Sequence, residues 1–346
     1  MTGSALVVGA GVGGLATAIG LRSAGWAVTV VERRAELERY GTAFAIHPAA
    51  QAALERLGVG AAFRELAVPY HSAQIRDPRG RVLASLPLER MEKKAGRPEL
   101  LISRPHLMEV LAAALAVHGD VPIEFSEPAT PAVLADGHDL VVGADGIRST
   151  VREATLGTRS GPRAVGDLAW IGVAGFETGS YGETWGKGRF FGMTPIEPGR
   201  TNWYAVTPAA ATPDDVRDAF ADWHDPIPRV LAATDPDTWI RYEMRHLYPA
   251  LPTFAPNPAT ALVGDAAHAM TPNLGQGACT AILDADALTR AVATHGPAAL
   301  KTALRAYDSE RRRAAQRVAF GSRTLHRLVT TRHTHLRNGL IRLMPS

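Results

Sequence analysis

Cysteine is nearly absent from this chain, and its absence excludes several classes of protein. Cys279 is the only cysteine among 346 residues, so it has no partner for an intramolecular disulfide. A single thiolate also cannot build a zinc ribbon or an iron–sulfur cluster. We therefore predict no metal site and a fold stabilised by packing.

Long apolar runs are also missing. No segment approaches the roughly 18 consecutive apolar residues that a membrane span requires. The N-terminal residues have neither a charged start nor a signal-peptide cleavage site. We therefore expect no integral membrane association and a cytoplasmic chain. With 46% hydrophobic and 21% charged residues, the composition is that of a globular protein long enough for two domains.

Basic residues are concentrated near the C-terminus. Ten arginines lie between position 305 and the end, against only Asp308 and Glu310, so the pI of 9.2 reflects one segment. We therefore expect no nucleic-acid partner. The segment is either a basic helix for an anionic membrane surface or a helix whose apolar residues, such as Leu325 and Val329, pack on the protein. The second interpretation is the simpler one.

The N-terminal residues predict a strand, a glycine turn, a helix and a second strand. Residues 5–9 and 27–31 are apolar runs, and residues 12–24 carry apolar side chains at helical spacing before Gly25. Because crossover connections are right-handed, the two strands should be parallel neighbours. The pattern predicts a Rossmann-like α/β unit.

Two kinds of residue pattern alternate along the rest of the chain. Aromatic residues alternate with small or polar ones between about 160 and 257, which predicts an antiparallel sheet. The other segments predict helices at 49–66, 104–117, 276–296 and 300–330 and a buried strand within 136–145. We therefore predict a Rossmann-like nucleotide-binding domain (1–70, 100–160 and 258–346), closed by C-terminal helices and interleaved with an antiparallel β-sheet substrate domain (71–99 and 161–257).

Residues 9–14, Gly-Ala-Gly-Val-Gly-Gly, carry the glycine spacing of dinucleotide-binding turns. Gly9 permits the tight turn, Gly11 lets a pyrophosphate approach the helix N-terminus, and Gly14 lets the helix approach the sheet. Glu32 ends the second strand, can accept both ribose hydroxyls, and repels a 2′-phosphate. The motif predicts FAD or NAD rather than NADP, although Arg33 weakens that distinction.

Two further blocks distinguish FAD from NAD. Residues 139–152 read DLVVGADGIRSTVR, and residues 261–278 read ALVGDAAHAMTPNLGQGA. Together with residues 9–14 they closely resemble the FAD-dependent class A monooxygenases, the para-hydroxybenzoate and salicylate hydroxylase family. The resemblance spans nearly the whole chain and implies an FAD-binding domain interleaved with the β-sheet substrate domain. The end at Ser346, without a thioredoxin-like extension, favours the compact salicylate-type or urate-type branch.

The third block also has a physical interpretation. Asp265 follows a buried strand and can accept a hydrogen bond from a ribityl hydroxyl. Backbone amides at the start of the 276–296 helix would stabilise the negative charge of reduced flavin. The family implies that Asp145 contacts FAD and that Arg104 matches an arginine that contacts its phosphates or ribose. The predicted FAD-binding residues are Gly9, Gly11, Val12, Gly13, Gly14, Glu32, Arg33, Arg104, Asp145, Asp265, Pro272, Gly275, Gln276, Gly277 and Ala278.

The resemblance implies a reaction cycle. NADH or NADPH, bound transiently, reduces the flavin, O2 adds at C4a, and the resulting hydroperoxide transfers one oxygen atom to an electron-rich carbon. The protein must hold the substrate, exclude water and, for a phenol, remove the hydroxyl proton. The expected partner is a small aromatic or heteroaromatic molecule, and the chain is expected to be a monomer or homodimer.

The substrate side is less specified by the sequence. Arg189, Phe191 and Met193 share one face of a predicted strand, and we predict that they line the substrate with the backbone around Pro272.

Two side chains are weak candidates for catalysis. Tyr204 could bind a substrate oxygen, and His47 follows a strand that in the family passes near the isoalloxazine and could act as a base. A structural role for either residue is the alternative.

Other functions are compatible with the same FAD fold. They are epoxidation, Baeyer–Villiger insertion, reduction, halogenation, or a non-catalytic flavin- or ligand-binding module. Halogenases carry a Trp-x-Trp pair, and no two tryptophans here are two positions apart, which disfavours halogenation. Ligand-stimulated oxidation of NAD(P)H would separate an enzyme from a binding module.

Overall fold

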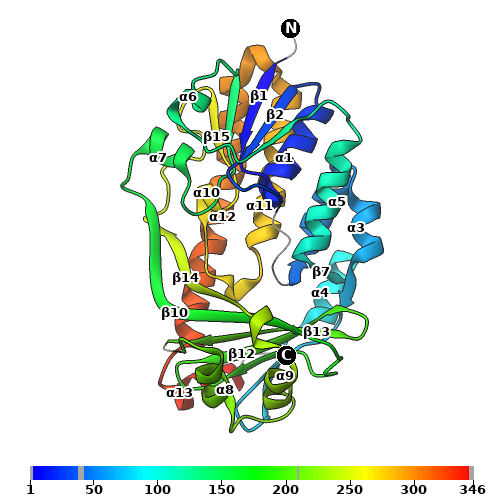
Figure 1. Ribbon diagram of the computed structural model, residues 1–346, viewed down its shortest axis with the longest axis vertical. Helices are drawn as coiled ribbons and strands as arrows, with labels where there is room; N and C mark the ends of the chain where they lie inside the picture. Colours follow the sequence, from blue (N-terminus) through cyan, green and yellow to red (C-terminus); the bar gives the residue numbers. More distant parts are fainter. Residues whose placement is uncertain (1–2, 38–42, 209, 343–346) are drawn as a thin grey trace.

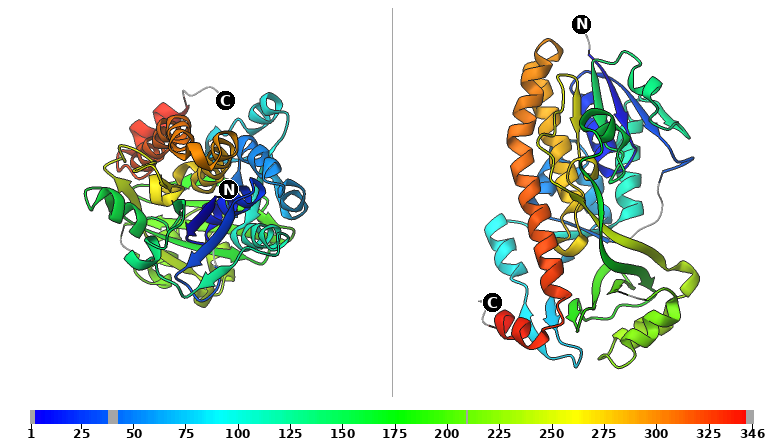
Figure 2. Two further views of the ribbon diagram at one scale, coloured as in Figure 1. Left: turned by 90° about the horizontal axis from the view of Figure 1, so that it is seen from above. Right: turned by 90° about the vertical axis from the view of Figure 1, so that its left-hand side faces the viewer.

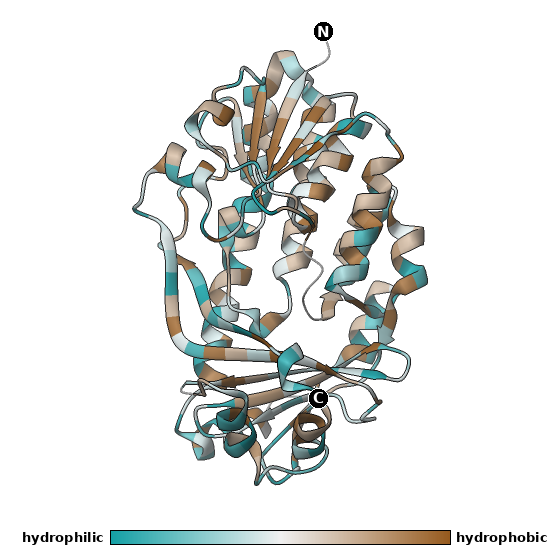
Figure 3. Ribbon diagram, viewed as in Figure 1, coloured by the Kyte–Doolittle hydropathy of each residue, from teal (hydrophilic) through white to brown (hydrophobic). Residues whose placement is uncertain are grey.

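The computed structural model describes residues 3–37, 43–208 and 210–342. One half of the molecule is built on a five-stranded parallel sheet with strand order β15-β9-β1-β2-β8 (Figure 1). β1 (Ser4–Val8) lies at its centre between β2 (Ala27–Glu32) and β9 (Leu140–Gly143). The apolar runs make β1 and its neighbours among the most hydrophobic parts of the chain (Figure 3), as expected for strands covered on both faces.

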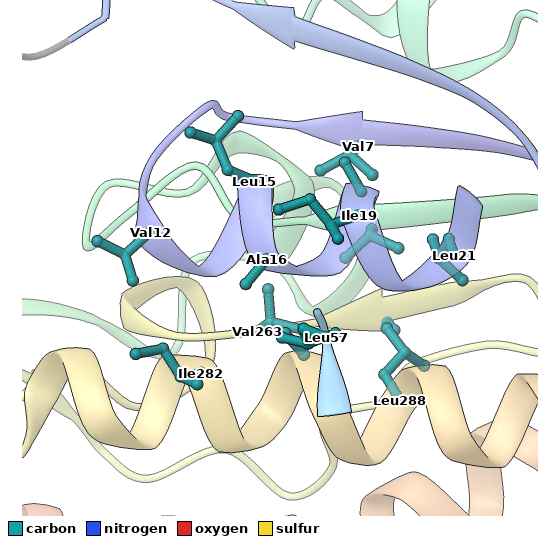
Figure 4. Close-up of a cluster of buried hydrophobic side chains, with 14 of the residues drawn as sticks. Val7, Val12, Leu15, Ala16, Ile19, Leu21, Leu57, Val263, Ile282 and Leu288 are labelled. Carbon is teal, nitrogen blue, oxygen red and sulfur yellow. The ribbon is translucent and has the colours of Figure 1, made fainter. Parts of the chain in front are cut away.

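Helices pack beside this sheet through apolar side chains. α1 (Val12–Ser23) contacts both α5 (Arg104–Ala116) and α11 (Gly277–His295). Figure 4 shows Leu15 and Ile19 on the side of α1 toward Val7 of β1 and away from α11, which carries Ile282 and Leu288, and all four side chains are at most 2% exposed. The helical spacing that predicted α1 from the sequence therefore marks its buried face.

The second half is a seven-stranded sheet with strand order β14-β10-β13-β12-β11-β5-β6. It combines strands from both segments predicted for the substrate domain. They are β5 (Gln74–Arg76), β6 (Val82–Ser85), β10 (Gly161–Ala174), β11 (Gly182–Trp185), β12 (Phe190–Glu197), β13 (Arg200–Thr207) and β14 (Ile240–Tyr248). The predicted fold class, a Rossmann-like parallel sheet interleaved with a largely antiparallel one, is confirmed.

The large sheet has two different faces. Its outer face is covered by α8 (Pro213–Phe220) and α9 (Ile227–Ala233), which pack on a cluster that includes Trp203. Its inner face is turned toward the other half of the molecule (Figure 1). There β12 contacts the small sheet formed by β3 (Ala43–Ile46), β7 (Glu99–Ser103) and β4 (Val68–Tyr70).

α12 (Leu300–Val329) joins the two halves along the length of the molecule (Figure 2). Its 30 residues correspond to about 45 Å. Near its C-terminal end, Leu325 and Val329 pack on the large sheet, so the helix is docked on the protein. Within the described residues, no helix is long and apolar enough to span a membrane.

The shorter elements complete the chain. The predicted helix at 49–66 is two helices, because the chain turns at Gly58, whose φ of 80° disfavours other residues. The remaining elements are α2 (Pro48–Arg56), α3 (Gly60–Leu66), α4 (Leu88–Ala95), β8 (Ile123–Phe125), α6 (Pro131–Leu134), α7 (Thr150–Leu156), β15 (Thr260–Leu262), α10 (Asp265–His268), α13 (Thr334–Arg342), and the 3-10 turns η1 (Pro236–Thr238), η2 (Pro272–Leu274) and η3 (Pro297–Ala299).

A buried polar network ties α10, α11 and α12 together around Asp284 of α11. One carboxylate oxygen accepts hydrogen bonds from His268 Nε2 (2.5 Å) and the Gly264 amide (3.0 Å), and the other accepts from Arg311 Nε (2.8 Å). Burial alone would raise the pKa of Asp284, but His268 and Arg311 outweigh it and hold this pKa below its ordinary value. Asp284 therefore remains ionised in the core.

Removing this carboxylate should destabilise the protein. In Asp284→Ala, Arg311 loses its buried counter-ion, and we expect a loss of about 3–5 kcal/mol in the free energy of unfolding. The wild-type contribution of Asp284 should be present above about pH 4 and be lost as the pH falls through its lower folded-state pKa. Urea unfolding of both proteins from pH 7 to pH 3 should therefore show their stabilities converging in acid. Asp214→Ala, with a side chain 87% exposed, should behave as wild type.

Trp203 should be the main anchor of the outer face. It is 0% exposed, stacks on Phe191 with ring centroids 5.7 Å apart, and donates from Nε1 to Thr234 Oγ1 at 3.1 Å. Trp203→Ala should cost about 3–5 kcal/mol in urea unfolding, because it leaves a large cavity. The matched change Phe320→Ala, at a site 63% exposed, should cost far less. Equal costs for the two changes would contradict this assignment.

Candidate active site

The glycine turn between β1 and α1 is rigid at two positions and open at a third. Gly9 has a φ of 103°, and a Cβ there would lie 2.5 Å from the Ala144 carbonyl oxygen. A Cβ on Gly14 would lie 1.8 Å from the Gly9 carbonyl oxygen. A Cβ on Gly11, the N-cap of α1, would meet no atom within 4 Å. The turn therefore leaves open space at a helix N-terminus that has no side-chain cap, an arrangement suited to a phosphate group.

Glu32 lies beside this turn at the end of β2. Its Oε2 accepts a hydrogen bond from the Ala10 amide at 2.8 Å, and its Oε1 accepts one from the Arg34 amide at 3.0 Å. These bonds fix the carboxylate next to the glycine turn. Arg33, the neighbouring predicted residue, is exposed.

The three sequence blocks meet around the glycine turn. A Cβ on Gly9 would approach the Asp145 Cα to 3.0 Å, so the second block lies against the first. Cβ atoms on Gly13 and Gly264 would lie 3.3 and 3.1 Å from the Ala281 Cβ, which brings in the third block. Asp145 Oδ2 accepts from the amides of Thr150 and Val151, whereas its Oδ1 is buried without a partner among the described residues.

Asp265 is the first residue of α10. Asp265 is exposed to solvent, but the protein around it limits the hydration of its carboxylate. This desolvation raises the pKa of Asp265, whereas His268 and Arg104 lower it in part. Arg104, the first residue of α5, lies over the Phe44 ring, 5.4 Å from its centroid. The predicted residues Asp265 and Arg104 are therefore neighbours.

The start of α11 offers backbone amides. Gln276 is its N-cap without a side-chain hydrogen bond, and a Cβ on Gly277 would meet nothing within 4 Å. Gly275, with a φ of 64°, connects this end to η2. Asn273 in η2 has both amide atoms buried without a partner among the described residues, and nothing in the sequence distinguishes it from its neighbours.

This donor set fits FAD. It offers two helix N-termini for a pyrophosphate and a flavin ring, carboxylates for sugar hydroxyls, and space where the glycines lack a Cβ. Among the residues that the structure describes, no group of histidine, cysteine, aspartate and glutamate side chains could hold a metal ion.

The inner face of the large sheet carries a polar pair. The Tyr204 hydroxyl of β13 donates to Glu183 Oε1 of β11 at 2.7 Å, and Trp185 Nε1 donates to Glu183 Oε2. Burial and Glu183 raise the pKa of Tyr204 well above its ordinary value. The Tyr204 hydroxyl therefore stays protonated, and it has a protein partner. Glu183 was missed from the sequence, where the only signal was a carboxylate in the middle of an aromatic-rich strand.

Arg189, Phe191 and Met193 do not line this face. Phe191 and Met193 are 0% and 4% exposed in the cluster under α8 and α9. The Arg189 guanidinium lies 5.8 Å from the ring centroid of Phe220 in α8. The three side chains therefore lie on the face opposite Tyr204, and their substrate-lining role stays a prediction, because strand alternation does not tell which face meets the other half. The residues in register with Tyr204 are those between them, such as Gly192.

His47 precedes α2 and pairs with an acidic side chain. Its Nδ1 lies 2.7 Å from Glu99 Oε2 of β7. Its backbone amide donates to Cys279 Sγ at 3.4 Å, and Cys279 donates to the Ala45 carbonyl at 3.0 Å. The strand before His47 is therefore attached to the start of α11, and Nε2 is the imidazole nitrogen without a partner among the described residues.

Comparisons with known proteins identify the family of this chain. The family model for the FAD binding domain matches residues 2–322. The chain is 34% identical over 338 residues to an aurachin C monooxygenase/isomerase of Stigmatella aurantiaca, covering 92% of this chain and 87% of that protein. It is 28% identical over 340 residues to an FAD-dependent urate hydroxylase of Klebsiella pneumoniae, covering 89% of this chain and 85% of that protein.

A solved structure shows the same fold. Klebsiella pneumoniae HpxO complexed with FAD and uric acid superposes with a TM-score of 0.87 at 24% identity, covering 99% of this chain and 93% of that one. The matched family model, the close relatives and the convergence of the three glycine and aspartate blocks lead to one conclusion: the chain belongs to the FAD-dependent class A monooxygenases.

Proposed function

We propose that this enzyme uses NADH or NADPH and O2 to hydroxylate a small aromatic or heteroaromatic molecule held between the inner face of the large sheet and the flavin. The observation that carries the proposal is the contrast between the two faces of β13. Trp203 on the outer face is 0% exposed. Tyr204, the next residue, points to the inner face and is partly exposed to solvent, although the surrounding protein raises its pKa by desolvation. This difference supports a ligand position on the inner face, on the side of the large sheet turned toward the other half of the molecule.

FAD, when bound, supplies hydride acceptance from NAD(P)H and activation of O2. The amides at the start of α1 bind its pyrophosphate past Gly11, and Glu32 binds the ribose. Asp265 accepts from a ribityl hydroxyl, and the N-terminus of α11 stabilises negative charge on the flavin ring.

The remaining residues act on the substrate. The inner face excludes water from one side of it, and Tyr204 positions Glu183 rather than removing a proton. His47 Nε2 has no hydrogen-bond partner among the described residues, and we propose that it accepts the proton of the substrate hydroxyl. The cytoplasmic location and the monomeric or homodimeric state are also proposed, and sedimentation would measure the latter.

The first test is spectroscopic and kinetic. The purified protein, with FAD added, should show the visible absorbance of bound oxidised flavin. NADH or NADPH oxidation should accelerate with an aromatic substrate, and the product should gain one atom of 18O from 18O2. No ligand-stimulated NAD(P)H oxidation with any ligand would favour a binding module, oxidation without oxygen transfer would favour a reductase, and an epoxide product would favour epoxidation.

Two glycine variants should separate cofactor binding from folding. Gly11→Ala places a methyl group in open space at an ordinary φ of −78°, so stability should change little while FAD affinity falls about tenfold or more. Gly14→Ala should instead destabilise the protein, because its Cβ overlaps the Gly9 carbonyl. Thermal unfolding without FAD and FAD titration by fluorescence measure the two effects. Equal FAD affinity in Gly11→Ala and wild type would contradict the assigned pyrophosphate position.

A further inference from the structure

The inner face holds a carboxylate that the fold itself does not require. Glu183 lies on β11, between β12 and β5 in the large sheet, and no cationic side chain in the described part of the chain forms an ion pair with it. Its partners are two neutral donors, Tyr204 and Trp185. This differs from Asp284, whose buried charge is compensated by Arg311.

The two donors favour the ionised form of Glu183. Trp185 Nε1 can only donate, so Glu183 Oε2 must accept. Burial raises the pKa of Glu183, and the bonds from Trp185 and Tyr204 lower it in part. Each carboxylate oxygen can accept a second hydrogen bond beyond these, so Glu183 has unused acceptor capacity at the inner face.

The surroundings of Glu183 repel negative charge. Tyr70 on β4 lies close enough to Glu183 and Glu99 that both carboxylates, together with burial, raise its pKa. Glu99 stands directly opposite Tyr70 in the small sheet and contacts His47. Two acidic groups therefore flank one tyrosine where the small sheet meets the large one.

The opposite side of the inner face has a different character. Tyr242 of β14 is 39% exposed, and Arg104 lowers its pKa against the larger effect of burial, which raises it to about 12. Arg104 also faces Asp265, in the cofactor-binding part of the site. Arg104 therefore acts on Tyr242 and Asp265, whereas Glu183 and Glu99 act on Tyr70.

We propose that Glu183 selects the substrate: its carboxylate accepts a hydrogen bond from an N–H or O–H group on a neutral or cationic aromatic ring and repels rings that carry a carboxylate. This inference rests on the proposed function. It assigns Tyr204 and Trp185 as positioning residues that hold the two carboxylate oxygens. The substrate class is therefore aromatic amines, phenols or N–H heteroaromatics without an acid group.

Matched probes test this selection on the FAD-loaded enzyme. 2-Aminophenol and salicylate differ by an amino group against a carboxylate on the same phenol, and 4-hydroxyquinoline and its 2-carboxylate form a second pair. Binding is measured by the change in flavin absorbance and by stimulation of NAD(P)H oxidation. Wild type should bind the neutral member of each pair at least about tenfold more tightly, the size of one hydrogen bond to a charged group.

Variants assign the preference to the carboxylate. Glu183→Gln should weaken binding of the neutral probes about tenfold and reduce their advantage over the acids, with FAD affinity unchanged. Tyr204→Phe keeps the Glu183 carboxylate and should retain the preference, and the wild-type preference itself remains a test if Glu183→Gln folds poorly. The control Asp222→Asn, an exposed carboxylate outside the inner face, should match wild type.

Several results would overturn the inference. They are a wild-type preference for the acids, no response to either neutral probe at millimolar concentration, an equal shift of both members of a pair in Glu183→Gln, or the same loss of preference in Tyr204→Phe. A protein that fails to bind FAD or to oxidise NAD(P)H would instead refute the proposed function. The two failures are therefore distinguishable.

Discussion

The buried carboxylate of Asp284 is the interaction on which the cofactor side of the molecule depends. It holds the Gly264 amide, His268 and Arg311 at once, and these groups come from the turn after β15, from α10 and from α12. Gly264 and His268 bracket Asp265, so the network fixes the short helix that presents this residue. An apolar core could fill the same space, but only directed hydrogen bonds determine both the position and the rotation of a four-residue helix.

The same network explains why the two halves keep a fixed relation. Arg311 lies on α12, and the same helix carries Val329 to the large sheet. β10 provides a second connection, since it follows α7 beside the parallel sheet and then pairs with β14 and β13 in the large sheet. A chemistry that needs a ring held over a flavin requires this rigidity, because small displacements of a reacting atom are costly in rate.

Sequence and structure agree where a local constraint determines the outcome. The turn at Gly9 and Gly14 was predictable because any side chain there would overlap a neighbouring carbonyl, and the helical spacing of α1 follows from its buried face. The choice of face on β12 was not predictable, because Phe190 and Phe191 are equally apolar and both are buried, under different elements. Glu183 and Asn273 were missed for a related reason: only the contacts made by distant segments distinguish them from surface residues.

The asymmetry of charge across the inner face follows from how the molecule is assembled. A flavin and its phosphates are electron-rich, so helix N-termini and Arg104 belong beside them. A carboxylate at the same place would oppose negative charge on the reduced ring. Glu183 lies on β11, which pairs with β5 and β12 in the large sheet. Placing the acid there, with neutral donors on both oxygens, lets it act on the substrate without opposing the charge that the cofactor must carry.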